Sequence, residues 1–542
     1  MDGFLGGSHQ PHTAPMGHRV SRDRFHSSGG RRIGDFKQPE GYHAAPQTVI
    51  SSVTAKQRPA QLDKAQQQAQ ASILNMTLPG GFTDKKGKKI KSKAKLAGKR
   101  STWRSIRKWG ARSALVFGAL VLVGGGYLGL QAYNKLHKVF KGGGTAAALQ
   151  ANVKPELLKG EGDGRINVLL LGKGGENHDG PDLTDTILVA SIDPLNKTVN
   201  LVSVPRDLWV TPAGSSSSKI NAVYANAKYH SLYTDPKNAQ KAEQAGISAI
   251  EQVVTQVLGI PLHYYGIVDF DAFKEAVDTV GGVTINVPED LVDASMAWEN
   301  KNNPVLAKKG VQNFNGTQAL MYVRSRHGSA RGDFDRTERQ RLFIQALSQK
   351  VLSAGTYSNP LKISELMNTF GNHVSTDFSI NDMLRLATLL KGVDMSKMGS
   401  IGLADPPNNY VRTDTVGNQS VVRPTAGFGD YSAIQSYIRN TLRDPYLAKE
   451  NAVITVLNGT ATAGLATKKA DELQSYGYNV TKVGDAPTQT YTQTTIVDLT
   501  AGKKPYTKNY LQKRFDVKVV TKIPDATIPT TGVDFVIILG DE

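Results

Sequence analysis

The sequence of 542 residues contains no cysteine. Disulfide bonds, a thiolate nucleophile and cysteine-ligated zinc are therefore all excluded. The motifs of several common enzyme classes are missing as well, because the chain has no GxxxxGK[ST] phosphate loop, no HExxH zinc motif and no GxSxG nucleophile turn. Glycines 160, 162 and 164 precede a predicted strand instead of following one, so they do not form a dinucleotide-binding turn.

The positive charge of the chain is concentrated at one end. The formal net charge is +18, and residues 1–112 hold 22 Lys/Arg against 6 Asp/Glu, whereas residues 113–542 hold 43 against 41. Residues 1–112 also have little hydrophobic periodicity, so we predict a disordered basic tail there. Because this tail has no helix-turn-helix or zinc-binding pattern, we expect no nucleic-acid partner.

Residues 113–133 (SALVFGALVLVGGGYLGLQAY) form an uncharged run of 21 residues, close to the length that crosses a bilayer. The run lies too far from the N-terminus to be a signal peptide. The 13 Lys/Arg of residues 85–112 lie directly before it. The positive-inside rule therefore predicts one transmembrane helix in the cell membrane, with a cytoplasmic N-terminus and the remaining chain outside. The basic block also suits anionic membrane lipid.

After a linker at 134–159, strand and helix patterns alternate. Apolar runs predict strands at 166–171, 186–193 and 198–204, and helical periodicity predicts helices at 242–258, 270–280, 336–353 and 380–391. This alternation indicates an α/β domain over 160–400, with a mixed sheet and helices on both faces. We predict an irregular connector at 401–450 and a small separate α/β domain at 451–542.

Charged residues gather in four stretches where loops are expected to leave strands. The stretches are LTDT (183–186), PRD (205–207), KIN (219–221) and YVRSRHGSARGDFDRTERQR (322–341). We expect Arg324 and Arg326 at the end of a strand, pointing to one side of the sheet. Because guanidinium groups bind phosphate oxygens in a bidentate fork, several of them beside carboxylates predict a site for a phosphate or diphosphate bridged by a metal. A solvated, salt-bridged helix face explains the same spacing about equally well.

Taken in order, these stretches resemble the LytR–CpsA–Psr family. The resembling segments are RINVLLLG (165–172), LTDTILVASIDP (183–194), VNLVSVPRDLWV (199–210), KINAVYANA (219–227), HYYGIVDFDAF (263–273), VDTVGGVTINVP (277–288) and ALMYVRSRH with GDFDRTERQ (319–340). They cover roughly residues 160–395. The segment VLNGTATAGLA (456–466) is similar to the LytR C-terminal domain that often follows in this family.

The resemblance implies a membrane-anchored phosphotransferase. Such an enzyme takes an anionic glycopolymer, for example teichoic acid, from a polyprenyl-pyrophosphate carrier and attaches it to peptidoglycan. The implied partners are therefore the carrier-linked glycopolymer, peptidoglycan and membrane lipid. A hydrolase that releases the polymer to water and an envelope-related transcriptional regulator remain as alternatives.

The resemblance also implies roles for individual residues. Asp185 matches the metal-binding carboxylate, with Mg²⁺ (or Mn²⁺) as the cofactor. The residues that match phosphate-holding or catalytic arginines are Arg206, Arg324, Arg326 and Arg336, and those on further substrate-binding positions are Asp207, Lys219 and Gln340. Gly174 stands where the family usually has an aspartate, so a second metal ligand would have to come from Glu176, His178, Asp179 or Asp182.

Overall fold

The computed structural model describes residues 142–176, 178–353 and 373–541. The predicted basic tail (1–112) and transmembrane helix (113–133) lie outside these residues. Within the described ranges, no helix combines the length and the hydropathy that a membrane crossing requires.

The central layer is a six-stranded sheet with the strand order β11-β6-β1-β2-β3-β12. Strand β2 is antiparallel to both β1 and β3, whereas β6 runs parallel to β1 and β12 runs parallel to β3. The predicted mixed sheet is therefore confirmed, together with its three predicted strands. The strands are β1 (Ile166–Lys173), β2 (Thr184–Asp193), β3 (Thr198–Ser203), β6 (Tyr264–Asp269), β11 (Val374–Thr376) and β12 (Gly399–Gly402).

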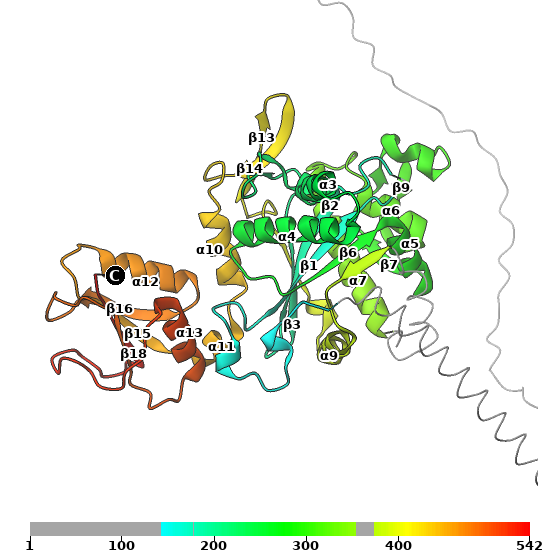
Figure 1. The fold of residues 1–542 in the computed structure, drawn as a ribbon. Helices are drawn as coiled ribbons and strands as arrows, with labels where there is room; N and C mark the ends of the chain where they lie inside the picture. Colours follow the sequence, from blue (N-terminus) through cyan, green and yellow to red (C-terminus); the bar gives the residue numbers. More distant parts are fainter. Residues whose placement is uncertain (1–141, 177, 354–372, 542) are drawn as a thin grey trace, which may run out of the picture. The chain divides into compact units, whose positions relative to one another are not determined.

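Helices cover both faces of this sheet. Side chains of each strand alternate between the faces, so apolar residues on both faces have to be buried. Leu169 and Leu171 of β1 are buried in one cluster with helix α4 (Ala239–Leu258). Ile166 and Val168 of the same strand lie in a different cluster with helix α9 (Ile380–Leu390). Figure 1 shows α4 and α9 on opposite sides of the strands.

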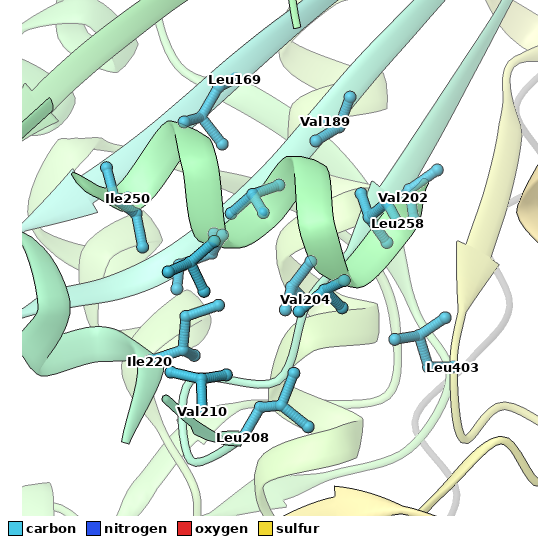
Figure 2. Close-up of a cluster of buried hydrophobic side chains, with 14 of the residues drawn as sticks. Leu169, Val189, Val202, Val204, Leu208, Val210, Ile220, Ile250, Leu258 and Leu403 are labelled. Carbon is cyan, nitrogen blue, oxygen red and sulfur yellow. The ribbon is translucent and has the colours of Figure 1, made fainter. Parts of the chain in front are cut away.

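Helix α4 illustrates how local sequence sets the boundaries of an element. The side chain of Asn238 accepts a hydrogen bond from a backbone N–H of the first turn, and Gly259 ends the helix in a left-handed conformation with φ 68°. Between these ends, apolar residues recur at helical spacing and face the sheet. Full burial of one such side chain contributes about 1.5–3 kcal/mol. Figure 2 labels part of this core: Leu169, Val189, Val202, Ile250 and Leu258.

A third buried cluster contains apolar residues at both ends of the arginine-rich stretch, among them Tyr322, Val323 and Phe343. Its principal elements are α5 (Phe270–Thr279), β7 (Val283–Val287), β10 (Gly310–Phe314), α6 (Gly316–Arg324) and α7 (Asp333–Ser353). Smaller elements nearby are β8 (Leu291–Val292), η4 (Ala294–Asn300) and β9 (Val305–Ala307). The four predicted helices correspond to α4, α5, α7 and α9, so their prediction is confirmed.

The prediction of an irregular connector at 401–450 is wrong. Residues 411–424 form an antiparallel pair of strands, and two helices follow. The elements are β13 (Val411–Val416), β14 (Gln419–Pro424), α10 (Ser432–Thr441) and α11 (Pro445–Glu450). Apolar side chains of this segment, among them Val411, Val422 and Ile438, belong to the main core under α4, so tertiary packing orders a stretch whose own pattern is weak.

The C-terminal residues form a second, four-stranded sheet in the order β16-β15-β18-β17, as expected for a small α/β domain. Its elements are β15 (Val453–Asn458), α12 (Leu465–Ser475), β16 (Asn479–Asp485), β17 (Thr495–Asp498), α13 (Pro505–Phe515) and β18 (Phe535–Leu539). Asp444 connects this sheet with the core, because its carboxylate accepts hydrogen bonds from the backbone of Gly164 (2.9 Å) and from the hydroxyl of Tyr510 (2.9 Å).

Candidate functional site

Asp185 and Arg206 meet at one edge of the main sheet. Strand β2 begins where its antiparallel neighbour β3 ends, so the start of one and the loop after the other lie together. Nη1 of Arg206 donates to Oδ1 of Asp185 at 2.7 Å, and Nδ2 of Asn221 donates to the same oxygen at 3.1 Å. Burial opposes ionisation of Asp185, but the charge and hydrogen bond of Arg206 outweigh it and lower the pKa of Asp185. The carboxylate is therefore ionised at neutral pH.

Arg336 reaches the same corner from the first turn of α7. Its Nη2 donates to the backbone oxygen of Asp185 at 3.1 Å and lies 3.1 Å from Oδ1 of Asp333. Arg336 is 3% exposed, and burial lowers its pKa to about 10, which still leaves it charged at neutral pH. Asp333 also lies 3.4 Å from Nε of Arg206. One carboxylate thus faces both guanidinium groups.

Arg324 and Arg326 do not end a strand, so that part of the prediction is wrong. Arg324 is the last residue of helix α6, and Arg326 lies in the loop that follows. Arg324 pairs with Glu299 at 2.9 Å, and its guanidinium lies over the ring of Phe270 at 4.8 Å. Arg326 is exposed and makes no ion pair with any described residue, so its charge is available to a ligand.

One cavity of about 400 Å³ unites these side chains. Of the predicted site residues, six line it: Asp185, Arg206, Arg324, Arg326, Arg336 and Gln340. Gln340 also donates from Nε2 to the backbone oxygen of Val323 at 3.2 Å. Asp207 and Lys219 do not line the cavity; they pair with each other at 2.8 Å, and Asp207 faces Nε of Arg206 at 3.7 Å. These two residues are therefore placed to support Arg206.

Two buried donors of the cavity lack an acceptor among the described residues. They are Nε of Arg206 and Nε of Arg336. Oδ1 of Asp333 lies near both guanidinium groups, yet it too accepts no hydrogen bond within the described residues. Buried N–H groups of charged side chains are costly to leave unpaired. Nε of Arg206 faces the carboxylates of Asp333 (3.4 Å) and Asp207 (3.7 Å), so the guanidinium is held electrostatically on that side.

The loop after β1 takes a course that requires glycine at position 174. A Cβ on Gly174 would lie 2.9 Å from Cβ of His178, closer than such contacts allow. His178 lines the cavity together with Asp179 and packs edge-on against Phe270, with ring centroids 4.8 Å apart. Asp182 is turned away and engaged by two ammonium groups, those of Lys173 (2.8 Å) and Lys228 (2.9 Å). Asp182 is therefore unsuited to a second metal contact.

The other arginines of the 322–341 stretch hold the protein together. Arg341 is 1% exposed and donates to the hydroxyls of Ser400, at 2.7 Å, and Ser203, which ties α7 to β12 and β3. Arg339 donates to the backbone oxygens of Tyr322 and Ser325. Arg331 pairs with Asp335 and Glu338 near the surface. The stretch thus combines ligand-facing, structural and salt-bridged surface arginines.

Three residues of the site were not predicted from sequence. Asn221, which donates to Asp185, belongs to the KIN stretch and lies two residues after Lys219. Asp333 precedes Arg336 by one helical turn, a spacing that signals an ion pair. Glu299 carries no such local signal, because it lies 25 residues before its partner Arg324.

Two sequence profiles of known protein families match this chain. The sequence profile of the LytR–CpsA–Psr family matches residues 130–423, and that of the LytR cell envelope-related transcriptional attenuator matches residues 451–542.

Curated relatives match part of the chain. The polyisoprenyl-teichoic acid–peptidoglycan teichoic acid transferase TagV of Bacillus subtilis (strain 168) is 32% identical over 251 residues, covering 45% of this chain and 58% of that protein. The cell wall biosynthesis protein LcpA of Corynebacterium glutamicum is 28% identical over 345 residues, covering 58% of this chain and 62% of that protein. The crystal structure of B. subtilis TagV matches with a TM-score of 0.39 and 27% identity, over 51% of this chain and 97% of that chain.

This chain spans about three-fifths of the length of the two curated relatives named here. The family profile, by contrast, covers more than half of the chain and includes the elements that bring Asp185, Arg206 and Arg336 together. The chain belongs to the LytR–CpsA–Psr family.

Proposed function

We propose that this protein is a phosphotransferase that attaches an anionic glycopolymer, carried on a polyprenyl diphosphate, to peptidoglycan. The observation that carries this proposal is the convergence of four arginines on one cavity beside Asp185. The arginines are Arg206, Arg324, Arg326 and Arg336. Two matching relatives, named as a teichoic acid transferase and a cell wall biosynthesis protein, support the same class of reaction.

The diphosphate would lie against Arg206 and Arg336, whose buried Nε groups lack an acceptor among the described residues. Guanidinium groups remain charged and bind phosphate oxygens in pairs. Arg326, which is exposed and makes no ion pair in the described part of the chain, would add charge at the cavity mouth. The site would therefore bind the lipid-linked glycopolymer through its diphosphate, which is the group that reacts.

We infer that Mg²⁺ (or Mn²⁺) binds together with the diphosphate at Asp185. The side chain of Asp185 is 36% exposed although its Oδ1 has two partners, and Mg²⁺ prefers such oxygen donors. Among the described residues, no group of three His, Cys, Asp or Glu side chains is placed to hold a metal. Asp185 would be the residue of this chain that holds the ion. When bound, the ion supplies charge neutralisation at the diphosphate.

In the reaction, an acceptor hydroxyl oxygen forms a bond to the phosphorus that carries the polymer. The bond from that phosphorus to the oxygen of the polyprenyl phosphate breaks, the polyprenyl phosphate leaves with the electron pair, and the hydroxyl proton is released. Phosphoryl transfer of this kind depends on positioning and charge stabilisation more than on covalent help. Arg206 and Arg336 would supply both, because their guanidinium groups are fixed by Asp185 and Asp333.

We also propose that residues 113–133 anchor the enzyme in the cell membrane, with the basic tail in the cytoplasm. The uncharged run and the adjacent basic block support this proposal. Anchoring confines the enzyme to the surface that holds its lipid-linked donor and raises the effective concentration of that donor.

The experiment combines the purified full-length chain in detergent with a polyprenyl-diphosphate disaccharide, peptidoglycan and Mg²⁺. We expect the sugar to become linked to peptidoglycan through a phosphodiester, and Arg206→Ala and Asp185→Ala to lower the rate by about 10²-fold or more. Arg412→Ala is the matched control, since Arg412 lies exposed on β13. Release of free sugar phosphate at the same rate without peptidoglycan would show a hydrolase and contradict the proposal.

A further inference from the structure

Trp298 is a large apolar side chain left in water beside the arginine cavity. It is 72% exposed, yet it lines the same cavity as Arg324 and Arg336. Aromatic side chains of this size ordinarily bury most of their surface, because that burial is strongly favourable. Trp298 therefore presents a free aromatic face at the wall of a cavity that polar and charged groups also line, a combination typical of ligand sites.

Contacts at both ends hold the segment that carries Trp298. Hydrogen bonds hold one end beside Arg326, and an ion pair holds the other end to Arg324. Trp298 belongs to η4, and the Asp293 that caps η4 is 1% exposed. Oδ2 of Asp293 accepts hydrogen bonds from the hydroxyl of Ser325 (2.7 Å) and the backbone N–H of His327 (3.3 Å), which flank Arg326. At the other end of η4, the neighbour of Trp298 pairs with Arg324 at 2.9 Å. The segment that carries the indole is thus held beside residues 324–327.

We propose that Trp298 is the platform of a sugar subsite, on which one pyranose ring stacks while the adjoining phosphate lies on the arginines. A pyranose has apolar C–H faces and polar hydroxyls around its edge. An indole face can pack on the apolar C–H face of the ring. The cavity lining supplies Ser295, Asp179 and His327 as hydrogen-bonding partners of the hydroxyls. This subsite rests on the proposed function, and it makes Trp298 a determinant of which glycan is transferred.

The test compares two diphosphates that differ only in a sugar, geranyl diphosphate and geranyl-diphospho-N-acetylglucosamine, by calorimetric titration of the full-length protein with Mg²⁺. The wild type is expected to bind the sugar-bearing probe on the order of tenfold more tightly. Trp298→Ala is expected to lose this preference while it binds geranyl diphosphate like the wild type. Trp298→Phe keeps an aromatic face and is expected to retain part of the preference. The control is Val311→Ala, because Val311 is 74% exposed and does not line the cavity.

A second titration uses a muropeptide disaccharide as the acceptor sugar, added to protein saturated with geranyl diphosphate. If Trp298→Ala weakens the sugar-bearing donor, the stacked ring belongs to the donor, and if it weakens the muropeptide, the ring belongs to the acceptor. Weaker binding of the sugar-bearing donor supports the subsite, whereas weaker binding of the muropeptide alone would overturn it. Unchanged affinities in both titrations would overturn it. Failure of the wild type to bind either diphosphate would contradict the proposed function itself, and the subsite with it.

Discussion

Nη1 of Arg206 lies 2.7 Å from Oδ1 of Asp185, where the start of β2 meets the loop after β3. Burial lowers the pKa of Arg206, but the charges of Asp185, Asp207 and Asp333 outweigh this effect and raise it above its ordinary value. The pair therefore stays charged throughout the physiological pH range. Each partner orients the other, so changes at either position should act on the same cavity.

The first prediction concerns the shape of the cation at position 206. In Arg206→Lys the positive charge remains, but an ammonium group cannot bind Asp185 and a phosphate oxygen at once through a planar fork. We expect kcat/KM for transfer to fall by about 10–100-fold. Arg412→Lys, on an exposed strand, is the control. Transfer at the wild-type rate in Arg206→Lys would show that charge alone suffices.

The second prediction separates structural from ligand-facing arginines. Arg341 is buried and bonds to Ser400 and Ser203, and Arg341→Leu removes these hydrogen bonds and leaves Asp405 without its closest cation. We expect the free energy of unfolding to fall by about 3 kcal/mol. Affinity for geranyl diphosphate should stay within about twofold, because Arg341 does not line the cavity. If Arg341→Leu lost most of its affinity for geranyl diphosphate at an unchanged free energy of unfolding, Arg341 would be a ligand-binding residue and not a structural one.

The third prediction is a pH dependence of stability from two partly buried acids. Burial, and after it the charge of Asp377, raises the pKa of Glu251 to about 7, and burial raises that of Asp377 to about 6. In the unfolded chain both groups ionise near pH 4. Between about pH 4 and pH 7 the folded state therefore holds protons that the unfolded state has lost, and the free energy of unfolding falls as the pH rises.

Glu251→Gln removes one of these groups, because an amide does not titrate. We expect the decline in unfolding free energy between pH 4.5 and pH 7.5 to shrink by on the order of 2 kcal/mol. Urea unfolding at the two pH values measures it. A decline as large as that of the wild type would show that Glu251 titrates normally in the folded protein.

The fourth prediction concerns Asp444, which joins the core to the C-terminal sheet. Asp444→Ala leaves the buried hydroxyl of Tyr510 and the backbone N–H of Gly164 without their acceptor. We expect a loss of about 2–4 kcal/mol in unfolding free energy. Asp444→Asn keeps one acceptor oxygen and should lose less. Calorimetric unfolding with an unchanged Tm in Asp444→Ala would mean that other contacts carry the connection.

Much of the main sheet could be predicted because its strands are continuous apolar runs. INVLLL is buried at all positions but one, and TVNLVSV buries its apolar residues Val199, Leu201, Val202 and Val204, so both segments are recognised without any knowledge of partners. Helix α6 lies where a strand is expected to end at Arg324 and Arg326. The signal for a helix was present, since Asn315 and Gln318 form a capping box.

The β13–β14 pair was missed for a different reason. Neither strand has a long apolar run, because VRTDTV buries only Val411 and QSVVRP buries only Val421, Val422 and Pro424. The turn between them contains Gly417 with φ 59°, and the dipeptide Gly-Asn at this turn was the available signal. Packing of Val411 and Val422 on the main core decides the structure there.

Within the site, sequence reasoning identified the residue types but not their distances. Asp185 and Arg336 are 151 residues apart and meet only because α7 packs against β12 and β3, next to the start of β2. No local pattern encodes such a contact. The resemblance to a family supplied the grouping, and the fold supplied the supporting Asn221, Asp333 and Glu299.

The central claim is that the arginines of this cavity hold a diphosphate together with a divalent ion. Its most direct test is a calorimetric titration of the full-length protein with geranyl diphosphate, with and without Mg²⁺, alongside Arg206→Ala and Arg412→Ala. We predict binding that needs Mg²⁺ and that weakens by at least about tenfold in Arg206→Ala, while Arg412→Ala binds like the wild type. Equal affinities for the wild type and Arg206→Ala would contradict the claim.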